Sequence, residues 1–86
     1  MILSEQIRAA RALLGWEQKT LAERAGLGIA TIKRMESSPG PVRGTAESVW
    51  AVQEALERAG IVFIHGAERK GPGVRLAVPW RAPGRE

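Results

Sequence analysis

The 86-residue sequence contains no cysteine and only one histidine, His65. The lack of cysteine excludes disulfide bonds, thiol nucleophiles and zinc sites built from cysteine. A single histidine without cysteine is no ligand set for zinc, so we expect His65 to be a surface or packing residue and the chain to hold no metal or cofactor. The four serines have no neighbouring base that the sequence suggests. An enzyme is therefore not expected.

Long apolar runs are also missing. No stretch approaches the roughly 20 consecutive apolar residues that a membrane-spanning helix needs, and no signal-peptide pattern is present. The apolar fraction of 44% and the charged fraction of 26% are ordinary for a soluble globular protein. We expect one domain with one modest core, located in the bacterial cytoplasm and without a membrane partner.

Acidic side chains are fewer than basic ones, nine against 13, which gives a formal net charge of +4. This excess indicates an acidic partner, nucleic acid first. The excess is unevenly distributed. Residues 1–60 hold eight basic and seven acidic side chains, a net charge of +1, whereas residues 61–86 hold five and two, a net charge of +3.

Helical periodicity covers most of the first 60 residues. The predicted helices cover residues 4–14, 18–25, 29–36 and 46–59. We expect the Ser4 hydroxyl to cap the first helix and Gly15 to end it in the left-handed conformation. Gly26 marks the turn between the second and third helices, and Thr45 can cap the fourth. The segment 37–44 is rich in turn residues and indicates a loop.

After the fourth helix the periodicity becomes that of strands. Residues 61–65 and 73–78 are rich in β-forming residues and are separated by glycine and proline, which predicts a hairpin. An isolated two-stranded hairpin is marginally stable in water, so it must pack on the helices or pair with a second chain. Residues 61–78 are therefore a candidate dimerisation element, with a mere cover of the helical core as the open alternative. Residues 79–86 are expected to form a flexible basic tail.

The most informative segment is Gln18–Glu36, QKTLAERAGLGIATIKRME. Ala22 is small where two helices must cross closely, and Gly26 permits the positive φ of a tight turn. Three apolar side chains can bury together beneath the two helices: Leu21, Ile32 and Met35. This arrangement is typical of a helix-turn-helix, which sets its second helix into the major groove of DNA.

The full spacing is Gln18-x-x-Leu21-Ala22-x-x-Ala25-Gly26-x-x-x-x-Thr31-Ile32-x-x-x-Glu36. It resembles the lambda-repressor-like helix-turn-helix family, of the Cro/repressor or XRE type, and the resemblance extends over about residues 3–78. It implies a mainly α fold of four to five helices, with residues 1–60 as the DNA-binding domain and the hairpin in place of the usual fifth helix. It also implies a transcriptional regulator, such as a repressor, that binds double-stranded DNA as a homodimer on a palindromic operator.

The resemblance assigns DNA contacts to three segments. Gln18 matches a position that hydrogen-bonds a DNA phosphate at the start of a helix. Lys33 and Arg34, on the outward side of the third helix, can reach a guanine edge or a phosphate. Arg43 matches a loop that grips the DNA backbone. For each basic residue singly, an ordinary solvated side chain is the alternative. The candidate DNA-binding residues are Gln18, Lys19, Gly28, Ile29, Ala30, Thr31, Lys33, Arg34 and Arg43.

Two positions depart from the family pattern. Glu17 stands where Ser or Thr commonly caps the second helix; it can accept an amide hydrogen bond but faces incoming phosphate. Gly28-Ile29-Ala30 replaces the polar residues that normally open the third helix, although Ala30 or Thr31 can touch a thymine methyl group. An exposed Ile29 suits a protein contact better than a base edge. The alternative function is therefore a protein-interaction module, antiactivator-like or antitoxin-like, on the same scaffold.

Overall fold

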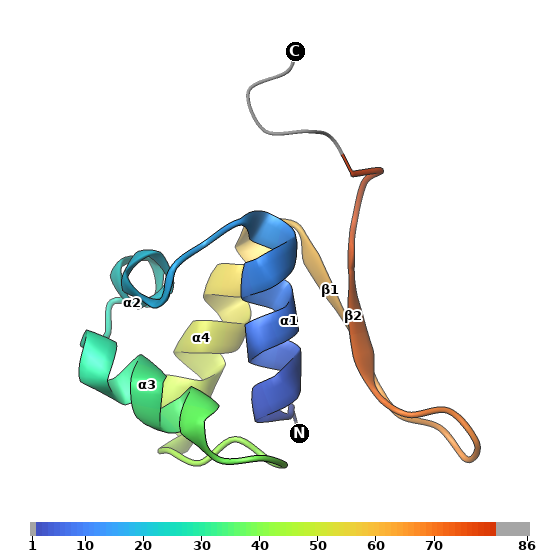
Figure 1. Ribbon diagram of the computed structural model, residues 1–86, viewed down its shortest axis with the longest axis horizontal. Helices are drawn as coiled ribbons and strands as arrows, with labels where there is room; N and C mark the ends of the chain where they lie inside the picture. Colours follow the sequence, from blue (N-terminus) through green and yellow to red (C-terminus); the bar gives the residue numbers. More distant parts are fainter. Residues whose placement is uncertain (1, 81–86) are drawn as a thin grey trace.

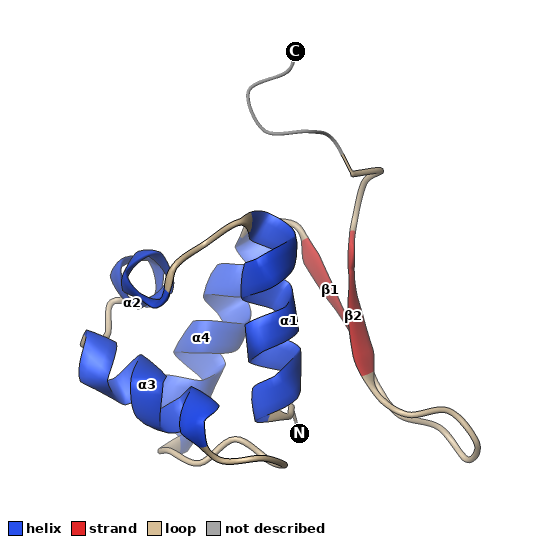
Figure 2. Cartoon of the chain, in the orientation of Figure 1, coloured by secondary structure: helices blue, strands red, loops and turns tan. Residues whose placement is uncertain are grey.

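Four helices are followed by a two-stranded antiparallel sheet in the computed structural model, which describes residues 2–80 (Figures 1 and 2). The elements are α1 (Ser4–Leu14), α2 (Gln18–Ala25), α3 (Ile29–Ser37), α4 (Ala46–Arg58), β1 (Ile61–Ile64) and β2 (Gly73–Leu76). The predicted mainly α fold with a C-terminal hairpin is confirmed. Of the tail expected over 79–86, residues 81–86 lie outside the described residues.

Local signals set most of the helix ends. Gly15 and Gly26 both have a φ of 69°, so each supplies the left-handed conformation that the turn after its helix requires. Thr45 caps α4 as predicted, because its hydroxyl oxygen accepts a hydrogen bond from the Ser48 amide at 3.1 Å. None of the helices within residues 2–80 combines the length and hydrophobicity that crossing a bilayer needs.

The predicted cap of α1 is wrong. Leu3 is the N-cap, and Ser4 already lies inside the helix. The Gln6 side chain does the capping, since its Oε1 accepts a hydrogen bond from the Leu3 amide at 2.8 Å. The buried Ser4 hydroxyl is thereby left for a distant partner, and it donates to the Met35 carbonyl of α3 at 2.6 Å.

All four helices and β1 contribute to one apolar core. Leu21 and Ile32 are 0% exposed and Met35 is 2% exposed, as the motif predicts. The complete set of buried apolar residues is Ile2, Ile7, Ala10, Leu21, Ala22, Ile32, Met35, Val52, Ala55, Leu56, Ile61 and Phe63. The apolar residues of α2 and α3 therefore belong to the same core as those of α1, α4 and β1.

The hairpin packs against the helices through one face. Ile61 pairs with Leu76 and Phe63 with Val74, so these four side chains share a face of the sheet. Ile61 and Phe63 are 3% and 8% exposed. β1 contacts α4, and β2 contacts α1. One face of the hairpin thus covers the core, while Ile64 on the other face is exposed.

Gln6 joins α1 to the hairpin. Its side chain is buried, and its Nε2 donates to the carbonyls of Gly73 at 2.9 Å and Ile64 at 3.3 Å. We expect Gln6→Leu to lower the free energy of unfolding by about 1–3 kcal/mol, because the carbonyls of Ile64 and Gly73 and the Leu3 amide lose their hydrogen bonds to the Gln6 side chain. Urea unfolding measures this loss.

Gln53→Leu is the matched control for this substitution. The Gln53 amide donates to the exposed Glu57 carboxylate on α4 at 3.5 Å, so we expect its loss to change stability by less than about 0.5 kcal/mol. Equal losses in the two variants would show that Gln6 does not tie the hairpin to α1.

Candidate nucleic-acid interface

α3 buries one side and exposes the other. Its buried residues are Ile32, Met35 and Glu36, which face the helical body. The nine candidate residues all reach the surface of the molecule. Lys19, Gly28, Ile29, Ala30, Lys33, Arg34 and Arg43 are exposed, and Gln18 and Thr31 are half-buried. Residues 28–34 lie together on α3 and its N-cap, whereas Gln18 and Lys19 open α2, and Arg43 lies in the loop before α4.

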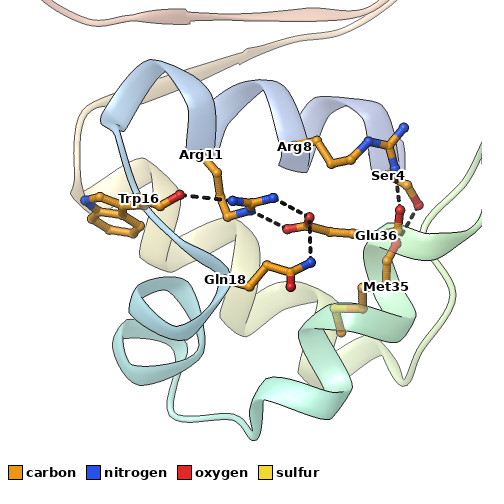
Figure 3. Close-up of polar contacts among 7 residues, drawn as sticks. All are labelled: Ser4, Arg8, Arg11, Trp16, Gln18, Met35 and Glu36. Atoms are coloured by element: carbon orange, nitrogen blue, oxygen red, sulfur yellow. Dashed lines mark hydrogen bonds and ion pairs between the residues drawn. The ribbon is translucent and has the colours of Figure 1, made fainter.

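An ion pair between the half-buried Arg11 and the buried Glu36 joins α1 to the end of α3 (Figure 3). The Glu36 residue is 5% exposed. It accepts two hydrogen bonds from Arg11, from Nε at 2.6 Å and from a terminal guanidinium nitrogen at 2.7 Å. The guanidinium also donates to the Trp16 carbonyl at 3.0 Å. The hydrogen bond to Glu36 raises the pKa of Arg11 above its usual range, so Arg11 keeps its charge.

Gln18 belongs to the same cluster. Its Nε2 donates to Glu36 Oε1 at 3.1 Å, which ties the start of α2 to the end of α3. An amide nitrogen carries two hydrogens, and this hydrogen bond uses one of them. Glu17, the N-cap of α2, makes no side-chain capping hydrogen bond.

Side chains also hold the C-terminal carbonyls of α3. No left-handed glycine ends this helix, since Ser38 at its C-cap is extended, with φ −108°. Ser4 donates to the Met35 carbonyl, and the Arg8 guanidinium donates to the Glu36 carbonyl. The last carbonyls of a helix lack partners within it, so these contacts fix α3 at its C-terminal end. The N-terminal end of α3 lies at the surface, and its N-cap residue, Gly28, makes no side-chain capping hydrogen bond.

Four residues that hold α3 in place are not among the nine DNA-binding residues predicted from the sequence. They are Ser4, Arg8, Arg11 and Glu36, and each acts by holding α3 in place. Arg8 and Arg11 lie off the apolar stripe of the first helix, and Glu36 ends the motif, which is the signal that the sequence offers for them.

The loop that carries Arg43 packs onto α3 through Gly44, the residue that follows Arg43. Gly44 has a φ of 153°, and a Cβ there would lie 3.2 Å from Cε of Met35. The loop also bonds to α1, because the Gly40 amide donates to the Glu5 carboxylate at 3.2 and 3.4 Å. Arg43 is thereby placed on a loop whose backbone has contacts with both α1 and α3.

The contact between Glu5 and the loop is expected to make the stability of the protein depend on pH. Hydrogen bonds from its own backbone amide and from Gly40 lower the pKa of Glu5. A lowered pKa in the folded state means that the contact contributes stability above the unfolded pKa, and that the contribution is lost as pH falls through the folded pKa. We expect wild type to lose slightly more stability than Glu5→Gln between about pH 6 and pH 3, measured by urea unfolding. Parallel pH profiles would contradict this account of the loop.

A family model described as Helix-turn-helix matches residues 7–58, more than half of the chain. The chain belongs to this helix-turn-helix family. The match spans all of α2, α3 and α4 and all of α1 except its first three residues, so the resemblance to the Cro/repressor and XRE type is confirmed. No curated protein matches the chain.

As a member of the helix-turn-helix family, the protein is a DNA-binding regulator, and the family is in general not enzymatic. Its two-helix unit corresponds to α2 and α3, with Gly26 at the turn. The second helix of such a unit is the one that enters the major groove. The second helix of the unit in this chain is α3, which is held at its C-terminal end and exposed at its N-terminal end.

Proposed function

We propose that the protein is a sequence-specific transcriptional regulator that binds a palindromic operator as a homodimer, with α3 of each copy in the major groove. The observation that supports this most is the placement of α3: one side is buried and hydrogen-bonded to α1, while Lys33 and Arg34 are exposed on the other. In this proposal the protein acts as a repressor in the bacterial cytoplasm, by occupying promoter DNA.

The proposed contacts divide into positioning and reading. Gln18, with the N-terminal amides of α2, binds a phosphate, and Lys19 and Arg43 contribute further backbone contacts. Lys33 and Arg34 reach a guanine edge or a phosphate from α3. The Arg34 guanidinium donates to the Thr31 hydroxyl at 3.3 Å, so its side chain lies back along the exposed side of the helix.

The small surface that one α3 can bury in DNA supports a dimer. One helix of nine residues buries little surface in a groove, and single modules of this size bind DNA weakly. Within residues 2–80, each strand of the hairpin has one edge without a partner strand. Ala77 donates to the Gly60 carbonyl at 2.8 Å, so the alternation of an antiparallel pair directs the backbone groups of Val74 and Leu76 away from β1. We propose that this edge of β2 pairs with its copy in a second chain.

An exposed apolar surface adjoins the end of β2. Leu13 at the end of α1 and Val78 and Trp80 after β2 line an open groove of about 470 Å³. Val78 is 69% exposed and Trp80 is 65% exposed. Apolar surface of this kind is often an interface, so its position beside β2 supports pairing through the hairpin.

A gel shift on DNA from the protein's own promoter tests the proposed function, with an unrelated duplex as the control. We expect a retarded band on the promoter duplex at low salt, and affinity that falls steeply between about 50 and 200 mM salt, as phosphate-dominated binding requires. Light scattering gives the oligomeric state, for which we expect a dimer. Absence of any retarded band at low salt would contradict DNA binding, and a monomer on DNA would contradict the hairpin pairing.

A protein-interaction module is the second candidate. The observation that favours it is Ile29, which is 41% exposed at the start of α3. Residues 1–60 also carry a net charge of only +1, eight basic against seven acidic side chains. The same gel shift separates the two functions, because an interaction module gives no retarded band.

A further inference from the structure

The first turn of α3 has an apolar surface. Gly28 is its N-cap, and Gly28, Ile29 and Ala30 are all exposed. None of these three residues has a side-chain hydrogen-bond donor or acceptor. The nearest hydroxyl, on Thr31, already accepts a hydrogen bond from Arg34. The side chains of Ile29 and Ala30 therefore offer DNA only methyl and methylene groups.

Cationic side chains border this apolar turn. Lys33 follows Ile29 by four residues and Arg34 follows Ala30 by four, so each pair lies one helical turn apart on the exposed side of α3. The apolar turn and the two cations thus form one continuous strip. Cations beside it suit an anionic partner, which favours DNA over an apolar protein surface as the occupant.

Base edges in the major groove differ in what they offer an apolar side chain. Guanine, adenine and cytosine present nitrogen and oxygen groups, whereas thymine adds a C5 methyl group. An apolar side chain against a polar edge removes water without replacing the hydrogen bond, which is unfavourable. Against a thymine methyl group it buries apolar surface on both partners, which is favourable.

We infer that Ile29 and Ala30 read thymine methyl groups, so that each operator half-site carries thymine beneath the first turn of α3. This inference rests on the proposed function, in which α3 lies in the major groove, and it adds the class of base that the helix selects. Lys33 and Arg34 then hold the flanking guanine edges or phosphates.

Deoxyuridine substitution tests the inference, because uracil differs from thymine only by the missing methyl group. The operator is first obtained by selection from random duplexes, and each thymine in a half-site is then replaced singly. We expect the dissociation constant to rise about fourfold at the thymines beneath the first turn of α3, the effect of one buried methyl group. At thymines elsewhere in the duplex we expect no change.

Ile29→Ala identifies the reading side chain. This variant should bind the thymine operator more weakly than wild type and should lose sensitivity to uracil at the same position. Ile64→Ala is the matched control, since Ile64 on the hairpin is 40% exposed, like Ile29 at 41%. The Ile64→Ala variant should show the same difference in affinity between the thymine and uracil duplexes as wild type. Circular dichroism checks that both variants fold.

Two results would overturn the inference in different ways. If selected duplexes bind but every thymine tolerates uracil, α3 does not read methyl groups, and DNA binding itself stands. If no duplex is selected or bound at low salt, the proposed function fails, and the inference fails with it.

Discussion

Replacing Glu36 by alanine is expected to lower the free energy of unfolding by about 3–5 kcal/mol, a large part of the stability of a small domain. The reason is that Glu36 is buried and accepts hydrogen bonds from Arg11 and Gln18. Its removal leaves the Arg11 charge without a partner in a partly buried place. Urea or thermal unfolding followed by circular dichroism measures the loss.

Two further variants make this prediction specific. Glu54→Ala removes an exposed carboxylate that lies 3.4 Å from Arg58, and we expect it to cost about 0.5 kcal/mol or less. The double variant Arg11→Met with Glu36→Leu removes both charges, and it should recover much of the stability that Glu36→Ala loses. If Glu36→Ala and Glu54→Ala lose the same stability, the buried pair does not hold α3.

The second large effect concerns DNA affinity. Arg34→Ala is expected to raise the dissociation constant for the operator by roughly 5- to 150-fold, because one arginine contact to a guanine edge contributes about 1–3 kcal/mol. If Lys33 contacts a phosphate, Lys33→Ala should weaken binding more evenly across sequences. It should also reduce the slope of the logarithm of the binding constant against the logarithm of the salt concentration by about 1. Both side chains are exposed, so unfolding should be unchanged within about 0.5 kcal/mol.

Arg58→Ala is the charge-matched control for these variants. Arg58 ends α4 and its side chain is 73% exposed, outside the strip formed by residues 28–34. Its loss should leave the affinity close to that of wild type. If Arg34→Ala and Lys33→Ala bind the operator as tightly as wild type and Arg58→Ala do, α3 is not the helix that reads DNA.

Much of the fold was predictable because its signals are local. Gly15 and Gly26 each need a left-handed conformation directly after a helix, and the sequence places a glycine at both points. Leu21 and Ile32 lie on the apolar sides of two successive helices and are buried as the helix-turn-helix pattern predicts. The change to strand periodicity after residue 60 likewise predicts the hairpin.

The long-range polar contacts were not predictable in this way. Ser4 looks like a helix cap from its neighbours, but its hydroxyl bonds to Met35, 31 residues away. Gln6 bonds to Gly73, 67 residues away, and nothing in the periodicity of α1 marks it. Such pairs depend on which helix ends meet in three dimensions, whereas sequence periodicity reports only which side of each helix is apolar.

The candidate site shows the same division. The spacing from Gln18 to Glu36 identifies the helix-turn-helix, and the family match agrees. The resemblance alone gives Gln18 a DNA contact, whereas the structure adds its hydrogen bond to Glu36. Ile29 appears in the sequence as a departure from the family pattern; its exposure beside Lys33 and Arg34 is what suggests a role in reading bases.

The central claim is that α3 reads DNA by sequence. Its most direct test is a fluorescence-anisotropy titration of two labelled duplexes at the same salt concentration, one from the protein's own promoter and one with the same bases shuffled. Wild type and the variant with both Lys33→Ala and Arg34→Ala are compared. The account predicts that wild type binds the promoter duplex more tightly than the shuffled one and that the variant loses this preference while staying folded. Equal affinity of wild type for both duplexes, or an undiminished preference in the variant, would contradict it.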